Sequence, residues 1–184
     1  MTDAIMQAFL RRQHEDGVAL ASESDLVEIE PLDLPADSPP DRFLVRFACR
    51  GLVKDAGGSI VEANEFGVGI WFPEDYLRNA DPFRVLTWLG PRHVWHPNIS
   101  SQAPVICVGR LAPGTGLVDL VYQCWEIITW NKVTMREEDA LNREACPWAR
   151  ANLARLPVDA RPLKRRALAI HTTDISPGAG HASS

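Results

Sequence analysis

The chain has 184 residues, of which 46% are hydrophobic and 23% charged, and its formal net charge is −5. This length and composition predict one globular domain with a full hydrophobic core. The acidic balance argues against a nucleic-acid partner, which usually meets a clustered basic surface. No apolar run approaches the ~20 residues of a membrane span, and the N-terminus lacks a signal-peptide pattern. We therefore expect no membrane partner and a cytoplasmic location.

The first two thirds of the chain predict one helix followed by strands. Residues 4–14 are good helix formers, with Asp3 as a candidate N-cap. Alternating apolar and polar residues predict four strands, at 26–32, 42–49, 66–72 and 83–89. Because the connections are short, these strands should form an antiparallel meander. After an irregular stretch, apolar residues at helical spacing from Leu117 to Ile128 predict another helix.

The last third predicts a further helix that starts at Asp139 or Asn142 and ends near Pro157. The side chains expected to be buried by it are Ala145, Trp148, Ala149 and Leu153. The fold class is thus expected to be α+β, with an N-terminal helix, a four-stranded antiparallel meander and C-terminal helices. Residues 1–170 should form a single domain, and the small, polar residues 171–184 a flexible tail.

The four cysteines lie far apart, and no Cys/His cluster has zinc-ligand spacing, so no metal and no other cofactor is expected. Cys49 alternates with inward strand residues, and Cys124 and Cys146 fall on apolar helix faces, which favours packing roles. Cys107 also has apolar neighbours, yet it lies in an irregular segment with polar residues and glycines around it. It is the candidate reactive thiol, with core packing as the alternative.

A His96-Pro97-Asn98 turn precedes this cysteine. Proline fixes its own φ and biases the preceding residue toward extended backbone, so this segment is not helical. The Asn98 amide could satisfy turn backbone groups, or donate to a carbonyl that acquires negative charge. His96 suits bracing the loop better than deprotonating the thiol. A thiol with an amide donor is the minimum needed for acyl transfer through a thioester.

An acidic run, Glu137-Glu138-Asp139, follows further along the chain. It fits a solvated face or a helix cap. Its functional alternative is to orient an incoming amine and accept a proton as that amine attacks.

These residues resemble the ubiquitin-conjugating enzyme family over roughly residues 4–155. The family's His-Pro-Asn turn followed by Gly-x-Ile-Cys-Leu is similar to residues 96–108, which end in Ile106-Cys107-Val108. Residues 71–76, Trp-Phe-Pro-Glu-Asp-Tyr, resemble the family's strand ending in Phe-Pro-x-x-Tyr-Pro. Residues 139–145, Asp-Ala-Leu-Asn-Arg-Glu-Ala, are similar to its Asp-Pro-Leu-Asn-x-Glu-Ala. The three motifs occur in the family's order.

The resemblance implies that Cys107 accepts the C-terminal glycine of ubiquitin or a ubiquitin-like protein from an activating enzyme. A lysine amine of an acceptor protein, or another thiol, would then take it. Asn98 matches the asparagine that stabilises the oxyanion or holds the active-site loop. Asp139 matches the acidic residue that gates the acceptor lysine.

The resemblance also implies a structural role for His96 and Pro97 in the active-site turn. It implies that the N-terminal helix, with Arg11 and Arg12, is where the activating enzyme docks.

The sequence departs from the family pattern at several points. The interval from Asn98 to Cys107 is one residue longer, and Gly114-Thr-Gly116 replaces the tryptophan expected after the cysteine. Sixteen arginines against three lysines hint at GC-rich coding. Together these features indicate a divergent bacterial member, similar to components of conjugation operons of which some act in antiviral defence against phage.

Two alternatives stay open. The chain could be a non-catalytic module of the same fold that binds ubiquitin-like proteins. It could also be a cysteine hydrolase that uses Cys107 with His93 or His96, although no orienting acid has a recognisable spacing.

Overall fold

The structure, a computed structural model, describes residues 4–33 and 38–164. Helix α1 (Ala4–Ser22) precedes an antiparallel sheet of β1 (Val27–Pro31), β2 (Arg42–Lys54), β3 (Ile60–Trp71) and β4 (Leu86–Gly90), paired in sequence order. Helix α2 (Pro82–Val85) leads into β4. The sheet is followed by α3 (Leu117–Ile128), a 3-10 turn (Glu137–Asp139), α4 (Ala145–Ala151) and a second 3-10 turn (Leu153–Arg155). The predicted α+β meander with flanking helices is confirmed.

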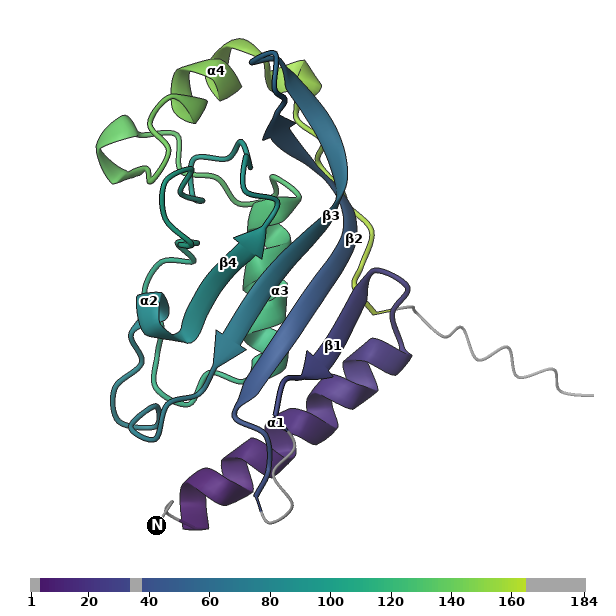
Figure 1. The fold of residues 1–184 in the computed structure, drawn as a ribbon, viewed down its shortest axis with the longest axis vertical. Coiled ribbons are helices and arrows are strands. Elements are labelled where there is room, and N and C mark those ends of the chain that lie inside the picture. The colour runs from purple at the N-terminus through teal and green to yellow at the C-terminus, as the bar shows by residue number, and fades with distance from the viewer. Residues whose placement is uncertain (1–3, 34–37, 165–184) are drawn as a thin grey trace, which may run out of the picture.

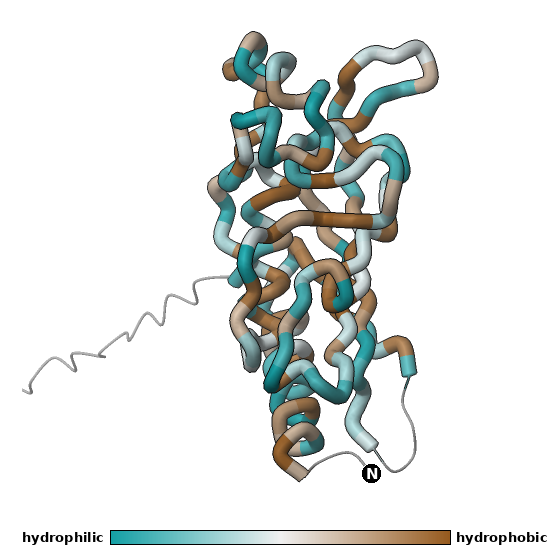
Figure 2. Tube along the Cα trace, turned by 90° about the vertical axis from the view of Figure 1, so that its left-hand side faces the viewer, coloured by the Kyte–Doolittle hydropathy of each residue, from teal (hydrophilic) through white to brown (hydrophobic). Residues whose placement is uncertain are grey.

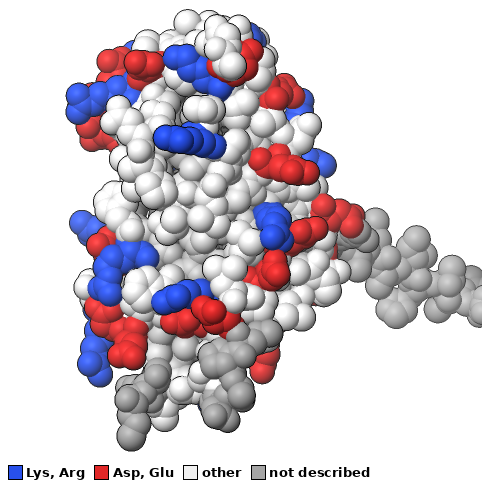
Figure 3. Space-filling model, in the orientation of Figure 1, with Lys and Arg blue, Asp and Glu red and all other residues white. Residues whose placement is uncertain are grey.

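The core lies between the sheet and α3, with α1 packed against α3 and β1 (Figure 1). Alternation along β2 buries Phe43, Val45 and Phe47 on the inner face. The outer face carries acidic and basic side chains close together around an uncharged central area (Figure 3). Seen from the side, the molecule is elongated, with α1 at one end (Figure 2). The β2–β3 turn and α4 lie at the other end (Figure 1).

The N-terminal helix is longer than predicted, because it continues through Gly17 to Ser22. A glycine inside a helix usually weakens it, yet here the missing side chain lets α1 approach α3. A Cβ at Gly17 would lie 2.8 Å from Cδ2 of Leu117. The candidate N-cap Asp3 lies outside the described residues.

Strands β2 and β3 extend beyond their predicted ranges, because β2 continues to Lys54 and β3 already begins at Ile60. The alternation of β2 breaks at a bulge between Ala48 and Gly51, but pairing with β3 resumes and continues to Lys54. The fourth strand starts later than predicted, at Leu86. The reason is that Asp81 accepts a hydrogen bond from Phe83 N and caps the short helix α2, with proline at its first turn.

The C-terminal helix differs most from the prediction. It begins at Ala145 without a side-chain cap, so the expected capping by Asp139 or Asn142 is wrong. Ala145 and Ala149 are buried as expected. Leu153 is 64% exposed, because the helix ends at Ala151 and a 3-10 turn then changes the direction of the side chains.

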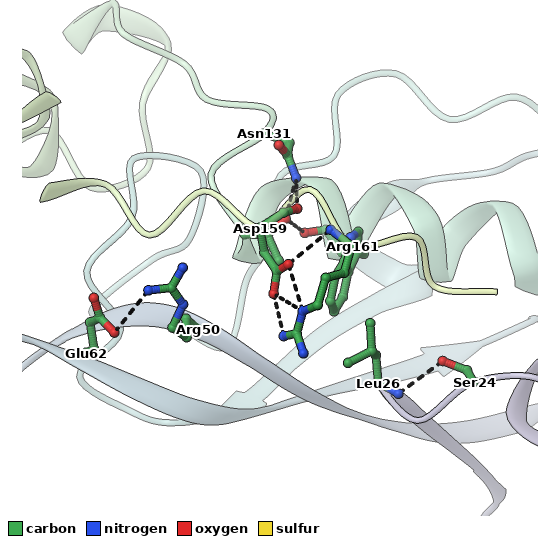
Figure 4. A network of polar contacts seen from close by, with 9 residues as sticks. Ser24, Leu26, Arg50, Glu62, Asn131, Asp159 and Arg161 are labelled. Carbon is green, nitrogen blue, oxygen red and sulfur yellow. Dashed lines mark hydrogen bonds and ion pairs between the residues drawn. The ribbon is translucent and has the colours of Figure 1, made fainter. Parts of the chain in front are cut away.

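After α4, residues 156–164 run back along the molecule toward α1. Leu163 of this segment is buried in the main core, and Lys164 forms an ion pair with Glu23, the residue that follows α1. The Asp159 carboxylate accepts hydrogen bonds from the guanidinium and the backbone N–H of Arg161 (Figure 4). We call residues 156–164 the C-terminal strap. The predicted domain end at 170 and the tail 171–184 lie outside the described residues.

Candidate active site

The His96–Asn98 turn follows β4 and begins where the chain passes the end of β2. Trp95 N donates to Leu52 O over 2.7 Å, and Val94 bridges Val53, so this segment is attached to the sheet. Ile99 N donates to His96 O, which closes the turn that the proline predicts.

A closed loop then brings Cys107 back opposite Asn98. Ile99 and Ile106 form an antiparallel bridge, and Cys107 N donates to Asn98 O over 2.8 Å. At the tip, the Ser100 hydroxyl accepts hydrogen bonds from Gln102 N and Ala103 N. The two ends of the loop are therefore paired, and the Ser100 side chain holds its tip.

Cys107 is partly exposed, whereas the other three cysteines are buried. Its neighbours Ile106 and Val108 are buried, and they anchor the backbone on both sides of the thiol. Burial raises the pKa of Cys49 and of Cys124 to about 12. Burial likewise raises the pKa of Cys146. Since the thiolate is the nucleophile, burial disfavours reaction at those three cysteines, and Cys107 is the accessible candidate.

The Asn98 side chain links Cys107 to the segment after α3. Its Nδ2 donates to Cys107 O (3.2 Å) and to Thr134 Oγ1 (3.0 Å). Its Oδ1 accepts a hydrogen bond from Thr134 N over 2.8 Å. The side chain has two amide hydrogens, and both are engaged in this arrangement. Asn98 thus holds the nucleophile's loop and also lies beside the position where an acyl group would be attached.

His96 is 1% exposed and packs against the Trp130 ring, with ring centroids 4.3 Å apart. Its Nδ1 accepts a hydrogen bond from Asn98 N over 3.0 Å, which places the proton of the neutral ring on Nε2. Burial lowers the pKa of His96 to about 3. Because Nδ1 is occupied and Nε2 is buried, His96 cannot take a proton from the thiol in this arrangement.

The residues that follow the acidic 3-10 turn are hydrogen-bonded to Pro97 of the His96–Asn98 turn. Leu141 N and Asn142 N both donate to Pro97 O, over 2.9 and 3.1 Å. Asp139 lies exposed just before these residues and forms an ion pair with Arg136, 3.7 Å between Oδ2 and Nε. A carboxylate is thereby held two residues from the Pro97 contact, with its side chain open to solvent.

Two further side chains contact the site without a signal in the sequence. Lys132 Nζ donates to Val108 O over 2.7 Å, and Arg150 NH1 donates to Met135 O over 2.7 Å. Thr134, which contacts Asn98, has no sequence signal either. These residues come close to the site only because the chain reverses after α3, and no local spacing predicts that reversal.

The predicted partner-binding arginines belong to a separate surface. Arg11 and Arg12 are exposed on α1, and Arg12 forms an ion pair with Asp16 one turn later. On its other side, α1 sends Gln13 to α3, where Oε1 accepts a hydrogen bond from Leu117 N over 2.7 Å. The two arginines are therefore available on a helix that is firmly fixed to the core.

Among residues 71–76, Phe72, Pro73 and Tyr76 are buried. Tyr76 is fully buried, and its hydroxyl donates to Thr115 O over 2.7 Å. Burial raises the pKa of Tyr76 to about 12. This contact joins the loop after β3 to the loop after Cys107.

Within residues 4–33 and 38–164, no group of three or more His, Cys, Asp and Glu side chains could hold a metal ion. In the same ranges, no helix combines the length and apolar character that crossing a bilayer requires.

Solved structures show which fold this is. One is a crystal structure described as that of a ubiquitin conjugating enzyme from Plasmodium yoelii, with a TM-score of 0.51, 18% identity, and coverage of 79% of this chain and 85% of that one. Another is the E2 domain of a Toxoplasma gondii ubiquitin conjugating enzyme, with a TM-score of 0.50, 17% identity, and coverage of 78% and 88%. No family model matches the sequence, and the search of curated proteins finds no match. The chain has the ubiquitin-conjugating fold, and at this identity the similarity concerns the fold alone.

Proposed function

We propose that the chain is a conjugating enzyme that carries ubiquitin or a ubiquitin-like protein as a thioester on Cys107. One observation supports the proposal: within a ubiquitin-conjugating fold, Cys107 has a partly exposed thiol, and its backbone is paired with Asn98 through two hydrogen bonds. An activating enzyme would supply the acyl group, and a lysine amine of an acceptor protein would remove it. The bacterial setting and a role against phage stay predictions from the sequence.

The chemistry consists of two acyl transfers. In the first, the Cys107 thiolate attacks the thioester on the activating enzyme, a new C–S bond forms, and the thiol of that enzyme leaves. In the second, the acceptor amine attacks, a C–N bond forms, and the Cys107 thiolate leaves while the amine loses a proton to solvent or to Asp139.

Asn98 is the group best placed to stabilise the oxyanion of each tetrahedral intermediate. One of its amide hydrogens is bonded to the Cys107 carbonyl and the other to the Thr134 hydroxyl. The hydroxyl contact is the one that can be exchanged, because Thr134 N still holds Asn98 Oδ1 when it is given up. Asp139 would orient the acceptor ammonium, in competition with its present partner Arg136.

The cysteine hydrolase is disfavoured by the state of His96, one of its two candidate bases. His96 is buried and neutral, with Nδ1 engaged by the backbone. His93 lies in a shallow groove beside Val53 and Lys54, and its carbonyl accepts a hydrogen bond from Lys54 N. The non-catalytic module remains the alternative that experiment must separate.

The test loads Cys107 without needing the partner proteins. A fluorescent peptide ending in Gly-Gly, supplied as a mercaptoethanesulfonate thioester, exchanges onto an accessible thiol. Discharge in excess free lysine is then followed on non-reducing gels, with the glutathione thioester of the same peptide as the uncatalysed reference. We expect lysine to discharge the protein thioester faster than the reference.

Matched variants make the result decisive. Cys107→Ser should lose the reducible adduct, whereas Cys124→Ser should keep it, since Cys124 is buried. Asp139→Asn should slow aminolysis more than hydrolysis. Discharge of the native chain at the reference rate would indicate the non-catalytic module, and cleavage of a preformed isopeptide would indicate the hydrolase.

The docking role of Arg11 and Arg12 is a separate part of the proposal. With ubiquitin, a ubiquitin-activating enzyme and ATP, the double variant Arg11→Glu and Arg12→Glu should load more slowly than the native chain. Its exchange with the peptide thioester should be unchanged. Equal enzymatic loading by both proteins would exclude this surface, and adduct formation that needs no activating enzyme would expose a chemical background.

A further inference from the structure

The chain has very few lysines, and they lie in different surroundings. There are three lysines against sixteen arginines. Lys54 pairs with Glu144 and lies over the Trp95 ring, and Lys164 pairs with Glu23. A guanidinium keeps its proton in proteins, so arginines do not compete as acyl acceptors, whereas each lysine is a source of a nucleophilic amine.

Lys132 is the lysine that lies at the site. Its Nζ donates to the carbonyl of Val108, the residue directly after Cys107, over 2.7 Å. A Cβ built on Gly109 would lie 4.0 Å from the same Nζ, which places the ammonium alongside two consecutive residues that follow the nucleophile. Lys132 N donates to Glu126 O, so the backbone from which the side chain extends is fixed by the end of α3.

The contact is polar and replaceable. The Lys132 side chain is exposed, and its partner is a single carbonyl rather than a carboxylate. Four methylene groups carry the amine, so it can leave Val108 O and move locally without any change in the fold. An amine held beside the residue that follows Cys107 would react with an acyl group on that cysteine as part of the same molecule, which favours it over an amine from solution.

We propose that Lys132 is an internal acceptor for the acyl group on Cys107, so that the chain conjugates itself there when no external amine arrives. This inference rests on the proposed function, because it needs the thioester. In the step, the deprotonated amine attacks the thioester carbonyl, a C–N bond forms, and the C–S bond breaks. The Cys107 thiolate leaves, and the proton lost by the amine goes to that thiolate through solvent.

The scarcity of lysine also matters for the rest of the surface. With arginine at most cationic positions, the thioester meets few amines of its own chain, and Lys132 is the one next to it. The product carries the acyl group beside the thiol, where it would obstruct further loading. Self-conjugation at Lys132 is thus expected to limit the number of turnovers of a chain that has no acceptor.

The experiment uses the peptide thioester ending in Gly-Gly and follows two adducts on the full chain. The adduct that dithiothreitol removes reports loading of Cys107, and the adduct that resists dithiothreitol reports an amide. Lys132→Arg keeps the charge and a donor for Val108 O but removes the amine. Lys54→Arg and Lys164→Arg are matched controls that leave Lys132 in place, and Cys107→Ser measures direct acylation by the reagent.

We expect all three arginine variants to load like the native chain. Lys132→Arg should form at least tenfold less resistant adduct, while the other two match the native chain and peptide mass spectrometry places the modification on Lys132. Normal loading with undiminished resistant adduct in Lys132→Arg, or with none in the native chain, would overturn the inference alone. Absence of the reducible adduct from every variant would overturn the proposed function and this inference with it.

Discussion

Asn98 and Thr134 exchange two hydrogen bonds, from Asn98 Nδ2 to Thr134 Oγ1 and from Thr134 N to Asn98 Oδ1. The pairing joins residues 36 positions apart in the chain and fixes the plane of the Asn98 amide. With its second hydrogen on Cys107 O, the same amide holds the loop of the nucleophile. Under the proposed function, this one side chain would both position the loop and stabilise the oxyanion, and substitutions of Asn98 and of Thr134 test the two roles separately.

The first prediction concerns Asn98→Ala. Loss of an oxyanion donor costs ~3 kcal/mol of transition-state stabilisation, so discharge to lysine should slow by ~100-fold while Cys107 still loads. The free energy of unfolding should fall by about 1–3 kcal/mol, because Thr134 N and Cys107 O lose their partner. Single-turnover discharge and urea unfolding measure the two effects. Unchanged discharge would remove Asn98 from the mechanism.

Thr134→Val is the matching change on the partner side. Valine has the shape of threonine and keeps the backbone N–H on Asn98 Oδ1, but it releases one Asn98 amide hydrogen. We expect discharge at the native rate or faster, with the free energy of unfolding lower by about 1 kcal/mol. A loss of rate as large as that of Asn98→Ala would instead mean that the Thr134 hydroxyl orients the amide for catalysis.

How much of the fold could be predicted depended on local signals. Strand alternation such as that of Phe43, Val45 and Phe47 follows from burial of one face of a sheet, and the structure confirms this strand. The end of β2 was missed because the bulge at Gly51 interrupts the alternation without ending the pairing. The passage of α1 through Gly17 depends on contact with Leu117, a hundred residues away, which no window contains.

The residues of the candidate site likewise fall into two groups, those with a local sequence signal and those without one. The thiol and the Asn98 turn carry their own sequence signals, since proline and an interrupted period mark them. Thr134 and Lys132 carry none, because their relation to Cys107 comes from the reversal of the chain after α3. Ordinary residue types reach the candidate site there through tertiary placement alone.

The buried His96 predicts a dependence of stability on pH. Burial lowers its pKa from 6.5 to about 3, so between these values the unfolded chain binds a proton that the folded chain does not. Stability must then rise with pH across this window and be lost as the pH falls, by roughly 1 kcal/mol for each pH unit. Urea midpoints between about pH 5 and pH 6.5 measure this above the titration of most carboxyl groups.

His96→Gln isolates the contribution of the imidazole. The variant should be less stable at neutral pH, but its stability should change less with pH in the same window. His93→Gln provides the control, because His93 is exposed and should leave the slope as it is. Equal slopes for the native chain and His96→Gln would show that the buried ring does not govern this dependence.

Gly51 predicts a steric effect at the bulge. A Cβ there would lie 2.5 Å from Cζ of Phe66 and 3.2 Å from the carbonyl oxygen of Ile128, so the Phe66 ring must move. Gly51→Ala should lower the free energy of unfolding by about 1–3 kcal/mol. Gly67→Ala is the matched control, because its nearest contact would be an ordinary 3.6 Å to Leu89 Cβ. Similar losses for both would attribute the effect to strand glycines in general.

The last prediction concerns Cys49 and the C-terminal strap, whose Asp159–Arg161 pair is shown in Figure 4. The side chain of Asp159 is 6% exposed, and its partner Arg161 is 55% exposed. Hydrogen bonds from Arg161 lower the pKa of Asp159, while the Asp159 charge adds to the burial that raises the pKa of Cys49. The charges of the strap therefore act on Cys49, which is buried, and we expect release of the strap to make its thiol accessible.

Arg161→Met keeps an apolar stem but leaves the Asp159 carboxylate without its cation. Because the arginine is more than half exposed, we expect the free energy of unfolding to fall by only about 1–2 kcal/mol. In a Cys107→Ser background, a thiol reagent should also label Cys49 faster. Arg50→Met is the matched control, since its ion pair with Glu62 is exposed on both sides and worth little.

The same pair predicts a dependence of stability on pH. The folded-state pKa of Asp159 lies below its unfolded value, so the stability that the Asp159–Arg161 pair contributes is present above the unfolded pKa and disappears as the pH falls. The difference between Arg161→Met and the native chain should shrink in acid for this reason. A constant difference, or equal Cys49 labelling in both arginine variants, would show that the Asp159–Arg161 pair does not hold the strap.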